Sequence, residues 1–177
     1  MKKLALIAMM AAALTSFGAT IPMDTLELRL GGNMDFNNPQ GKVDWLVESG
    51  LGYFVFDNIE FGGIVNWGYN GYDMGLGLGG FGEVNLDLDS FIMPYFAMRL
   101  QYCFGGYYRA SSEYYRNTAE HNYVLWEPAV GLKFFLSESV AIYSELYFDL
   151  ASEDAFVQGE DAKNNDLGLK AGVRCYF

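Results

Sequence analysis

The chain ends in the stretch LGLKAGVRCYF, residues 167–177, and this stretch decides the fold. Its side chains fall into two alternating sets. The apolar set is Leu167, Leu169, Ala171, Val173, Cys175 and Phe177, and the other set is Gly168, Lys170, Gly172, Arg174 and Tyr176. In a β-strand the two sets face opposite sides, and the stretch has the ~9–11 residues that a tilted strand needs to cross a bilayer. The pattern therefore predicts a membrane-spanning strand.

Seven earlier segments alternate in the same way, with an apolar face opposite a face of glycines and charged residues. They are residues 25–32, 43–54, 59–69, 75–87, 91–103, 123–136 and 140–150. The chain has 21 Gly, 13 Tyr and 14 Phe but only 4 Pro, a composition that suits a membrane barrel. We therefore expect an all-β fold, an eight-stranded antiparallel up-and-down transmembrane β-barrel.

The connections between these segments alternate in length. Tight turns are expected around Asp57, Asp89 and Glu138, and longer loops at residues 33–42, 70–74, 104–122 and 151–165. Short periplasmic turns and long external loops are typical of outer-membrane barrels. An even number of strands then places both chain ends on the periplasmic side.

Alternation alone does not say which face is inside, and a soluble barrel would bury the apolar set. Aromatic residues near strand ends favour the membrane arrangement, because aromatic girdles lie at membrane interfaces. These residues are Trp45, Trp67, Tyr69, Tyr102, Trp126 and Phe177. We therefore expect the charged set to point into the lumen, with a soluble barrel as the alternative.

The N-terminus has the layout of a secretory signal peptide. Lys2 and Lys3 precede an apolar stretch, residues 4–14, and small residues around Ser16 and Gly18 suit a signal peptidase. We expect residues 1–18 to be the cleavable signal peptide and residues 19–177 the barrel domain, with cleavage after Ala19 or an uncleaved anchor as alternatives. Without Lys2 and Lys3, 9 basic and 22 acidic residues remain, a balance that excludes a general nucleic-acid binder.

The chain resembles the small eight-stranded outer-membrane barrels of the OmpA and OmpX type. The residues that carry the resemblance are GYFVFDN at 52–58, PYF at 94–96, EPAVGLK at 127–133 and the closing Tyr176-Phe177. The resemblance implies a Gram-negative outer-membrane location and a monomer in contact with outer-membrane lipids and lipopolysaccharide. It also implies that Tyr176 and Phe177 form the signal for the barrel-assembly machinery. The chain stops at the barrel, so a peptidoglycan-binding role is not carried over.

The expected lumen carries a network of acids and bases. Its members are Glu27, Arg29, Glu48, Glu60, Glu83, Arg99, Glu127, Lys133, Glu145, Asp149, Lys170 and Arg174. Since an eight-stranded barrel is just wide enough for side chains to fill it, and unpaired buried charges cost several kcal/mol each, we expect a paired and largely sealed core. Lys170 and Arg174 would act as counter-charges. A narrow ion or small-solute conduit is the alternative.

The third long loop is the candidate recognition element, with Tyr107, Tyr108, Arg109, Tyr114, Tyr115 and Arg116. Tyr and Arg are enriched at binding hot spots, although tyrosines also anchor at lipid headgroups. A ligand bound by this loop would be extracellular, because the long loops of such barrels are external.

The same loop holds His121, the chain's one histidine, with Ser111, Ser112, Glu113 and Glu120 nearby. An outer-membrane lipid enzyme of the Ser-His-acid type is a distant third hypothesis, because the His-x-Ser pattern of lipid A deacylating barrels is absent. The acids Glu153, Asp154, Glu160, Asp161 and Asp166 suggest a solvated acidic fourth loop, with divalent cations bridging it to lipopolysaccharide as the alternative. Cys103 and Cys175 lack metal-ligand partners, so we expect no metal site. They fall near opposite ends of different expected strands, so we expect no disulfide between them. We expect neither an enzyme nor a cofactor.

Overall fold

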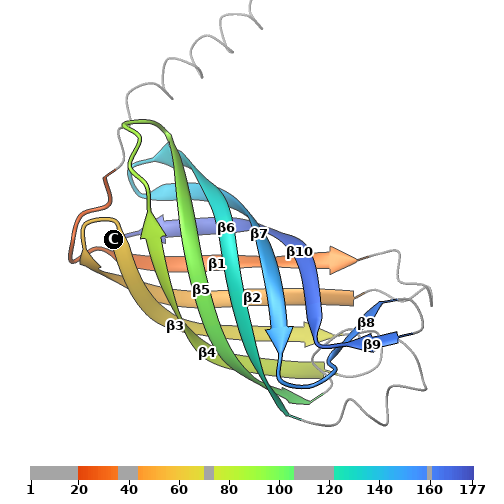
Figure 1. Ribbon diagram of the computed structural model, residues 1–177. Coiled ribbons are helices and arrows are strands. Elements are labelled where there is room, and N and C mark those ends of the chain that lie inside the picture. The colour runs from red at the N-terminus through yellow and green to blue at the C-terminus, as the bar shows by residue number, and fades with distance from the viewer. Residues whose placement is uncertain (1–19, 36–43, 70–73, 106–121, 159–160) are drawn as a thin grey trace, which may run out of the picture.

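The computed structural model describes residues 20–35, 44–69, 74–105, 122–158 and 161–177 (Figure 1). Eight strands form a closed barrel, in the order β1-β10-β7-β6-β5-β4-β3-β2. They are β1 (Leu26–Asp35), β2 (Asp44–Phe56), β3 (Ile59–Tyr69), β4 (Met74–Asn85), β5 (Ile92–Gly105), β6 (Tyr123–Ser137), β7 (Val140–Ala151) and β10 (Asn165–Tyr176). The predicted eight-stranded antiparallel barrel is confirmed. The predicted signal peptide lies outside the described residues.

The C-terminal strand closes the barrel against the first one. On one side β10 pairs with β1, placing Cys175 opposite Leu28, and on the other side with β7, placing Lys170 opposite Glu145. The N–H of Phe177 donates to the carbonyl of Leu26, and the N–H of Leu26 donates to that of Phe177. The last residue is therefore part of the closing ladder.

The connections at one end of the barrel are tight. Asn58, with φ of 62°, and Asp89, with φ of 50°, adopt the left-handed conformation that Asn and Asp tolerate better than other non-glycine residues. The C-terminus lies at the same end (Figure 1), which we call the short-turn end. The opposite end, which carries the longer connections, is the long-loop end.

The fourth long connection differs from the expectation. Two short antiparallel strands, β8 (Phe156–Gln158) and β9 (Asp161–Lys163), form a hairpin within the expected loop 151–165. Asp166, expected in that loop, belongs to β10 and is buried. Three-residue strands are too short for alternation to reveal them. Elsewhere the corrections concern strand ends: β1 continues to Asp35, and β4 begins at Met74.

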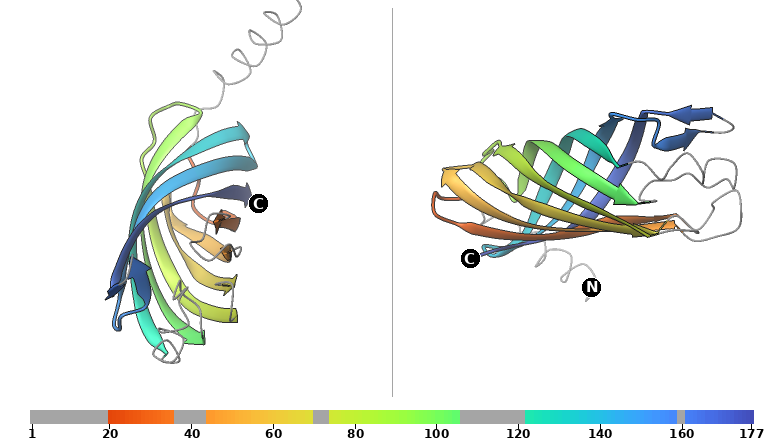
Figure 2. Two further views of the ribbon diagram at one scale, coloured as in Figure 1. Left: turned by 90° about the vertical axis from the view of Figure 1, so that its right-hand side faces the viewer. Right: turned by 90° about the horizontal axis from the view of Figure 1, so that it is seen from below.

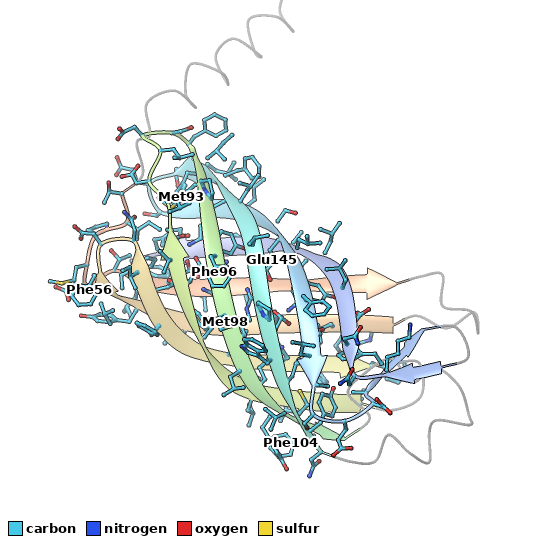
Figure 3. The ribbon with its side chains drawn as sticks, viewed as in Figure 1. Phe56, Met93, Phe96, Met98, Phe104 and Glu145 are labelled. Atoms are coloured by element: carbon cyan, nitrogen blue, oxygen red, sulfur yellow. The ribbon has the colours of Figure 1, made fainter. Side chains whose placement is uncertain are left out.

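The barrel has its apolar face outside and its charged face inside. Every barrel strand exposes large apolar side chains on the outer wall, with Leu169 68% and Phe61 58% exposed. In Figure 3, Phe96 and Phe104 lie on this wall, whereas Glu145 is buried. Figure 2 shows the tilt of the strands from two further directions. This distribution is the reverse of a soluble barrel's and argues against the soluble alternative.

Aromatic side chains cluster on the outer wall toward the long-loop end. The rings of Trp45 and Trp67 meet edge to face at 5.3 Å, and those of Tyr102 and Phe104 at 4.8 Å. Such a cluster has the composition and place of an interfacial girdle. In the part of the chain that the structure describes, no helix has the length and apolarity to span a membrane.

Candidate functional site: the charged barrel interior

All twelve residues of the expected lumen network are buried inside the barrel, each with at most 2% of its surface exposed. Alternation puts them there, because each occupies the inward parity of its strand. Their ion pairs fall into two groups at different heights along the barrel. Glu27, Arg29, Glu60, Glu83, Lys133 and Arg174 form what we call the balanced layer, near the short-turn end. Glu48, Arg99, Glu127, Glu145, Asp149 and Lys170 form the acidic layer, nearer the long-loop end.

The balanced layer pairs three carboxylates with three cations. Arg174 Nη1 lies 3.0 Å from Glu27 Oε1 and 2.8 Å from Glu83 Oε2. Lys133 Nζ lies 2.6 Å from Glu83 Oε1, and Arg29 pairs with Glu27, Glu60 and Glu83. Charges match within the layer, so each buried carboxylate has the counter-charge that its burial requires.

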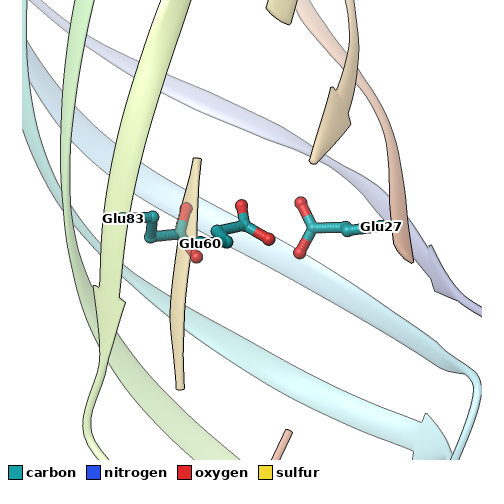
Figure 4. A group of neighbouring side chains, drawn as sticks. All are labelled: Glu27, Glu60 and Glu83. Atoms are coloured by element: carbon teal, nitrogen blue, oxygen red, sulfur yellow. The ribbon is translucent and has the colours of Figure 1, made fainter. Parts of the chain in front are cut away.

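Glu27, Glu60 and Glu83 could form a metal site by geometry alone, since ligand atoms from the three lie within 4.8 Å of one another (Figure 4). Their environment argues against it. The side chains of Arg29, Lys133 and Arg174 already neutralise the three carboxylates, so a bound metal ion would leave the layer with uncompensated positive charge. We interpret this cluster as an ion-pair core.

The acidic layer has more carboxylates than cations. Arg99 Nη1 lies 2.6 Å from Glu127 Oε1, and Arg99 Nη2 lies 2.7 Å from Glu145 Oε2. Lys170 Nζ lies 2.7 Å from Glu127 Oε2 and 3.0 Å from Glu48 Oε2. Neither cation forms a salt bridge to Asp149 among those found between described residues, and four acids of this layer share two bases. The two layers therefore differ in net charge.

Tyrosines fill the space between the layers. Tyr95 donates a hydrogen bond from its hydroxyl to Glu145 Oε2 at 2.7 Å, and the Arg174 guanidinium lies 4.5 Å from the centre of the Tyr95 ring. The same guanidinium also lies 4.5 Å from the centre of the Tyr143 ring. Tyr95 thus contacts the acidic layer through its hydroxyl and the balanced layer through its face. Alternation alone gives both tyrosines the inward parity of their strands, but it does not reveal this role.

Glycines make room for these rings. A Cβ added at Gly131 would lie 2.6 Å from Cε1 and Oη of Tyr95, closer than atoms pack. Gly131 faces Tyr95 directly across the β5–β6 ladder. Gly131 is one of the inward glycines that alternate with charged residues in the sequence. Because it has no side chain, it leaves the space that the Tyr95 ring occupies.

An apolar cluster closes the interior at the short-turn end. It consists of Ile21, Phe54, Met93, Phe135, Ala141 and Tyr176. The segment before β1 supplies Ile21, whose N–H donates to Asn58 Oδ1 at 2.9 Å and whose carbonyl accepts from the Asn58 N–H at 2.9 Å. The chain therefore crosses this mouth of the barrel before entering the first strand.

A second apolar cluster lies at the long-loop end. Its members are Leu46, Cys103, Tyr123, Leu125, Ala151, Ala155 and Phe156. Phe156 belongs to the β8–β9 hairpin and is 1% exposed. The hairpin that the sequence did not reveal thus inserts an aromatic side chain over the acidic layer. Both charged layers lie between apolar caps.

Several sequence-predicted residues lie outside the described part of the chain. These are Tyr107, Tyr108, Arg109, Tyr114, Tyr115 and Arg116 of the candidate recognition loop, and His121 with the neighbouring serines and glutamates. Of the expected assembly signal, Tyr176 is buried in the short-turn cap and Phe177 is 77% exposed. The two cysteines are free, with Cys103 inside the barrel and Cys175 on the outward parity.

Comparison with solved structures agrees on the fold. The chain is similar to the crystal structure of the N-terminal β-barrel domain of Pseudomonas aeruginosa OprF, with 14% identity, 89% of this chain and 100% of that one covered, and a TM-score of 0.59. Neisserial surface protein A matches with 16% identity, coverages of 86% and 95%, and a TM-score of 0.51. A chain from the de novo design of transmembrane β-barrels matches with 13% identity, coverages of 89% and 99%, and a TM-score of 0.57.

No family model matches the chain, and no curated protein sequence matches it. At sequence identities this low, the structural similarity shows the shared fold alone. The fold is that of the small eight-stranded outer-membrane barrels, as the sequence resemblance implied.

Proposed function

We propose that this protein is a monomeric barrel of a Gram-negative outer membrane, with a sealed interior, that supports the envelope and presents surface loops for adhesion or recognition. The sealed interior is supported by the succession of side-chain layers along the barrel. An apolar cap, the balanced layer, the tyrosines, the acidic layer and a second apolar cap follow one another along the barrel. A barrel of eight strands leaves little room beyond such side chains.

The membrane location is supported by the inside-out distribution of residues. The apolar outer wall would be unstable in water, where large exposed apolar patches cause association, but it matches the hydrocarbon of a bilayer. Outer-membrane lipids and lipopolysaccharide are therefore the proposed surroundings. The exposed Phe177 is the proposed contact for the barrel-assembly machinery.

Conductance in planar bilayers tests the sealed interior. We expect the refolded wild-type protein to show no steady openings. The double variant Lys170→Ala/Arg174→Ala removes one cation from each layer and should conduct, whereas the outward-facing Leu169→Ala should behave as the wild type does. Steady wild-type openings that change in an Arg99→Ala variant would refute the seal and favour the ion-conduit alternative.

The recognition role is supported by the sequence of the third long loop, with its tyrosines and arginines. If the interior is sealed, the external loops are the parts that remain for specific contacts. A variant lacking residues 105–119 should lose adhesion of cells that display the protein, while a variant with altered short turns should keep it. Unchanged adhesion after the deletion would remove this loop as the recognition element.

A further inference from the structure

A hollow of about 460 Å³ lies on the outer wall of the barrel, over β4, β5 and β6. Phe96, labelled in Figure 3, is one of the outward residues that line it. The strand register places Phe96 between Val84 on β4 and Val130 on β6. The outward side chains of the lining are all apolar, and they are Val84, Leu86, Pro94, Phe96, Val130 and Leu132.

The shape of the hollow is fixed by a proline. The Pro94 ring is small and has no rotamer freedom to lose when a ligand packs on it, and it lies beside Leu132 in the β5–β6 register. The Leu86 N–H donates to the Pro94 carbonyl at 2.8 Å. Pro94 has no N–H to donate in return, and β4 ends at Asn85. The Leu86 carbonyl thus lies at the edge of the hollow without a ladder bond from Pro94.

The hollow lies toward the short-turn end, which is the periplasmic end in barrels of this class. Leu86 is the last lining residue of β4 before the β4–β5 turn, and Pro94 follows that turn on β5. The hollow therefore opens to the acyl chains of the periplasmic leaflet.

The rim beside the hollow is acidic. The charged side chains exposed at the short-turn end, among the described residues, are Asp24, Asp57, Asp87, Asp89 and Glu138, whereas the exposed base Lys163 lies in β9 at the long-loop end. Asp89 follows Leu86 by three residues, so their Cα atoms are at most about 10 Å apart. Such a rim repels an anionic headgroup and attracts a cationic group.

We infer that this hollow binds one acyl chain of a periplasmic-leaflet phospholipid with an ammonium headgroup, such as phosphatidylethanolamine. A lipid tail is as apolar as the wall, so shape and headgroup charge decide which lipid stays there. The tail packs on Phe96 and Leu132, and the ammonium group donates to the Asp89 carboxylate, a charge-assisted hydrogen bond. The inference rests on the membrane location in the proposed function and adds a lipid class and its place.

Native mass spectrometry of the full chain, refolded in detergent micelles, counts the bound lipid. The probes are phosphatidylethanolamine and phosphatidylglycerol with identical acyl chains, added together in equal amounts. We expect one bound lipid per barrel, with the ethanolamine lipid favoured by about fivefold, as one exposed ion pair allows. Val130→Trp, which fills the hollow, should lose this lipid. Asp89→Asn should keep one lipid but lose the preference.

Each variant has a matched control. Val65→Trp makes the same change on the outward face of β3, away from the hollow, and should bind lipid as the wild type does. Asp57→Asn removes an exposed acid of the β2–β3 turn at the same end and should keep the preference. Leu132→Trp replaces Val130→Trp if the latter does not give a folded barrel, which heat-dependent migration in gels reports.

Three results would overturn the inference. Equal lipid binding by Val130→Trp and the wild type would place the lipid elsewhere on the wall. Equal binding of the two lipids by the wild type would remove the role of the acidic rim. A dimer in place of the lipid adduct would assign the hollow to a contact between two copies of the chain. Bilayer conductance tests the sealed interior separately, so the first two results leave the proposed function standing.

Discussion

The two charged layers are both built of buried carboxylates, arginines and lysines, but they differ in charge balance. In the balanced layer Glu27, Glu60 and Glu83 are matched by three cations, whereas in the acidic layer four carboxylates share Arg99 and Lys170. The contribution of a buried carboxylate to stability depends on its neighbours. Removing a carboxylate that is paired with a cation is costly, whereas removing an unpaired one is not. Equivalent substitutions in the two layers should therefore have opposite effects.

The largest effect is expected for Glu83→Gln in the balanced layer. Glu83 accepts from Arg174 Nη1 at 2.8 and 2.9 Å and pairs with Lys133 at 2.6 Å. Loss of its charge leaves these cations unmatched, and we expect the free energy of unfolding to fall by about 3–5 kcal/mol. Urea unfolding in lipid vesicles measures it. A loss below about 1 kcal/mol would mean that water reaches this layer.

An intermediate effect is expected between the layers, for Gly131→Ala. The new methyl group would displace the Tyr95 ring and weaken its bond to Glu145 and its contact with Arg174. Overpacking of this kind costs about 1–3 kcal/mol. Gly63→Ala, whose added Cβ would have its nearest neighbour at 3.9 Å, is the control and should unfold nearly as the wild type does. Equal stability of the two variants would show that the tyrosine does not couple the layers.

A smaller effect, of opposite sign, is expected for Asp149→Asn in the acidic layer. The amide removes one uncompensated charge and can donate an N–H to Glu127, so unfolding should require up to about 1 kcal/mol more. The matched comparison is Glu83→Gln, the same carboxylate-to-amide change one layer away. If both variants lose stability alike, the difference between the layers is not electrostatic.

The smallest effect is expected outside both layers, at the segment that crosses the short-turn mouth. The Thr20 hydroxyl donates to the Asp87 carboxylate and, with the N–H of Asp89, lowers the pKa of Asp87 below its ordinary value of 3.8. The contact therefore stabilises the folded protein at pH values above the ordinary pKa. This stabilisation disappears as the pH falls through the lowered pKa of Asp87.

Thr20→Val should therefore raise the pKa of Asp87 toward 3.8, which carboxyl NMR in micelles can follow. The stability change should stay below about 0.5 kcal/mol, since the site is exposed. A pKa of Asp87 that does not move would show that Thr20 does not hold this contact in solution.

The sequence alone was a good guide to the barrel wall. Alternation with a period of two assigns each side chain to a face once the strand is recognised, so the twelve lumen residues could be named from their parity. It was a poor guide within the long connections, where the three-residue strands of the β8–β9 hairpin and the buried place of Asp166 escaped it. Short strands carry too few residues for a period to be detected.

The sequence by itself determined the strand count, the inward charges and the outward apolar belt, because these depend on local alternation and turn chemistry. Only the tertiary structure decided which acid meets which base. Arg174 and Lys170 lie four residues apart on one strand, yet they belong to different layers with different charge balance. That division depends on the register around a closed barrel, where pairing partners such as Arg174 and Glu27 are 147 residues apart in the chain, and alternation carries no information over such a separation.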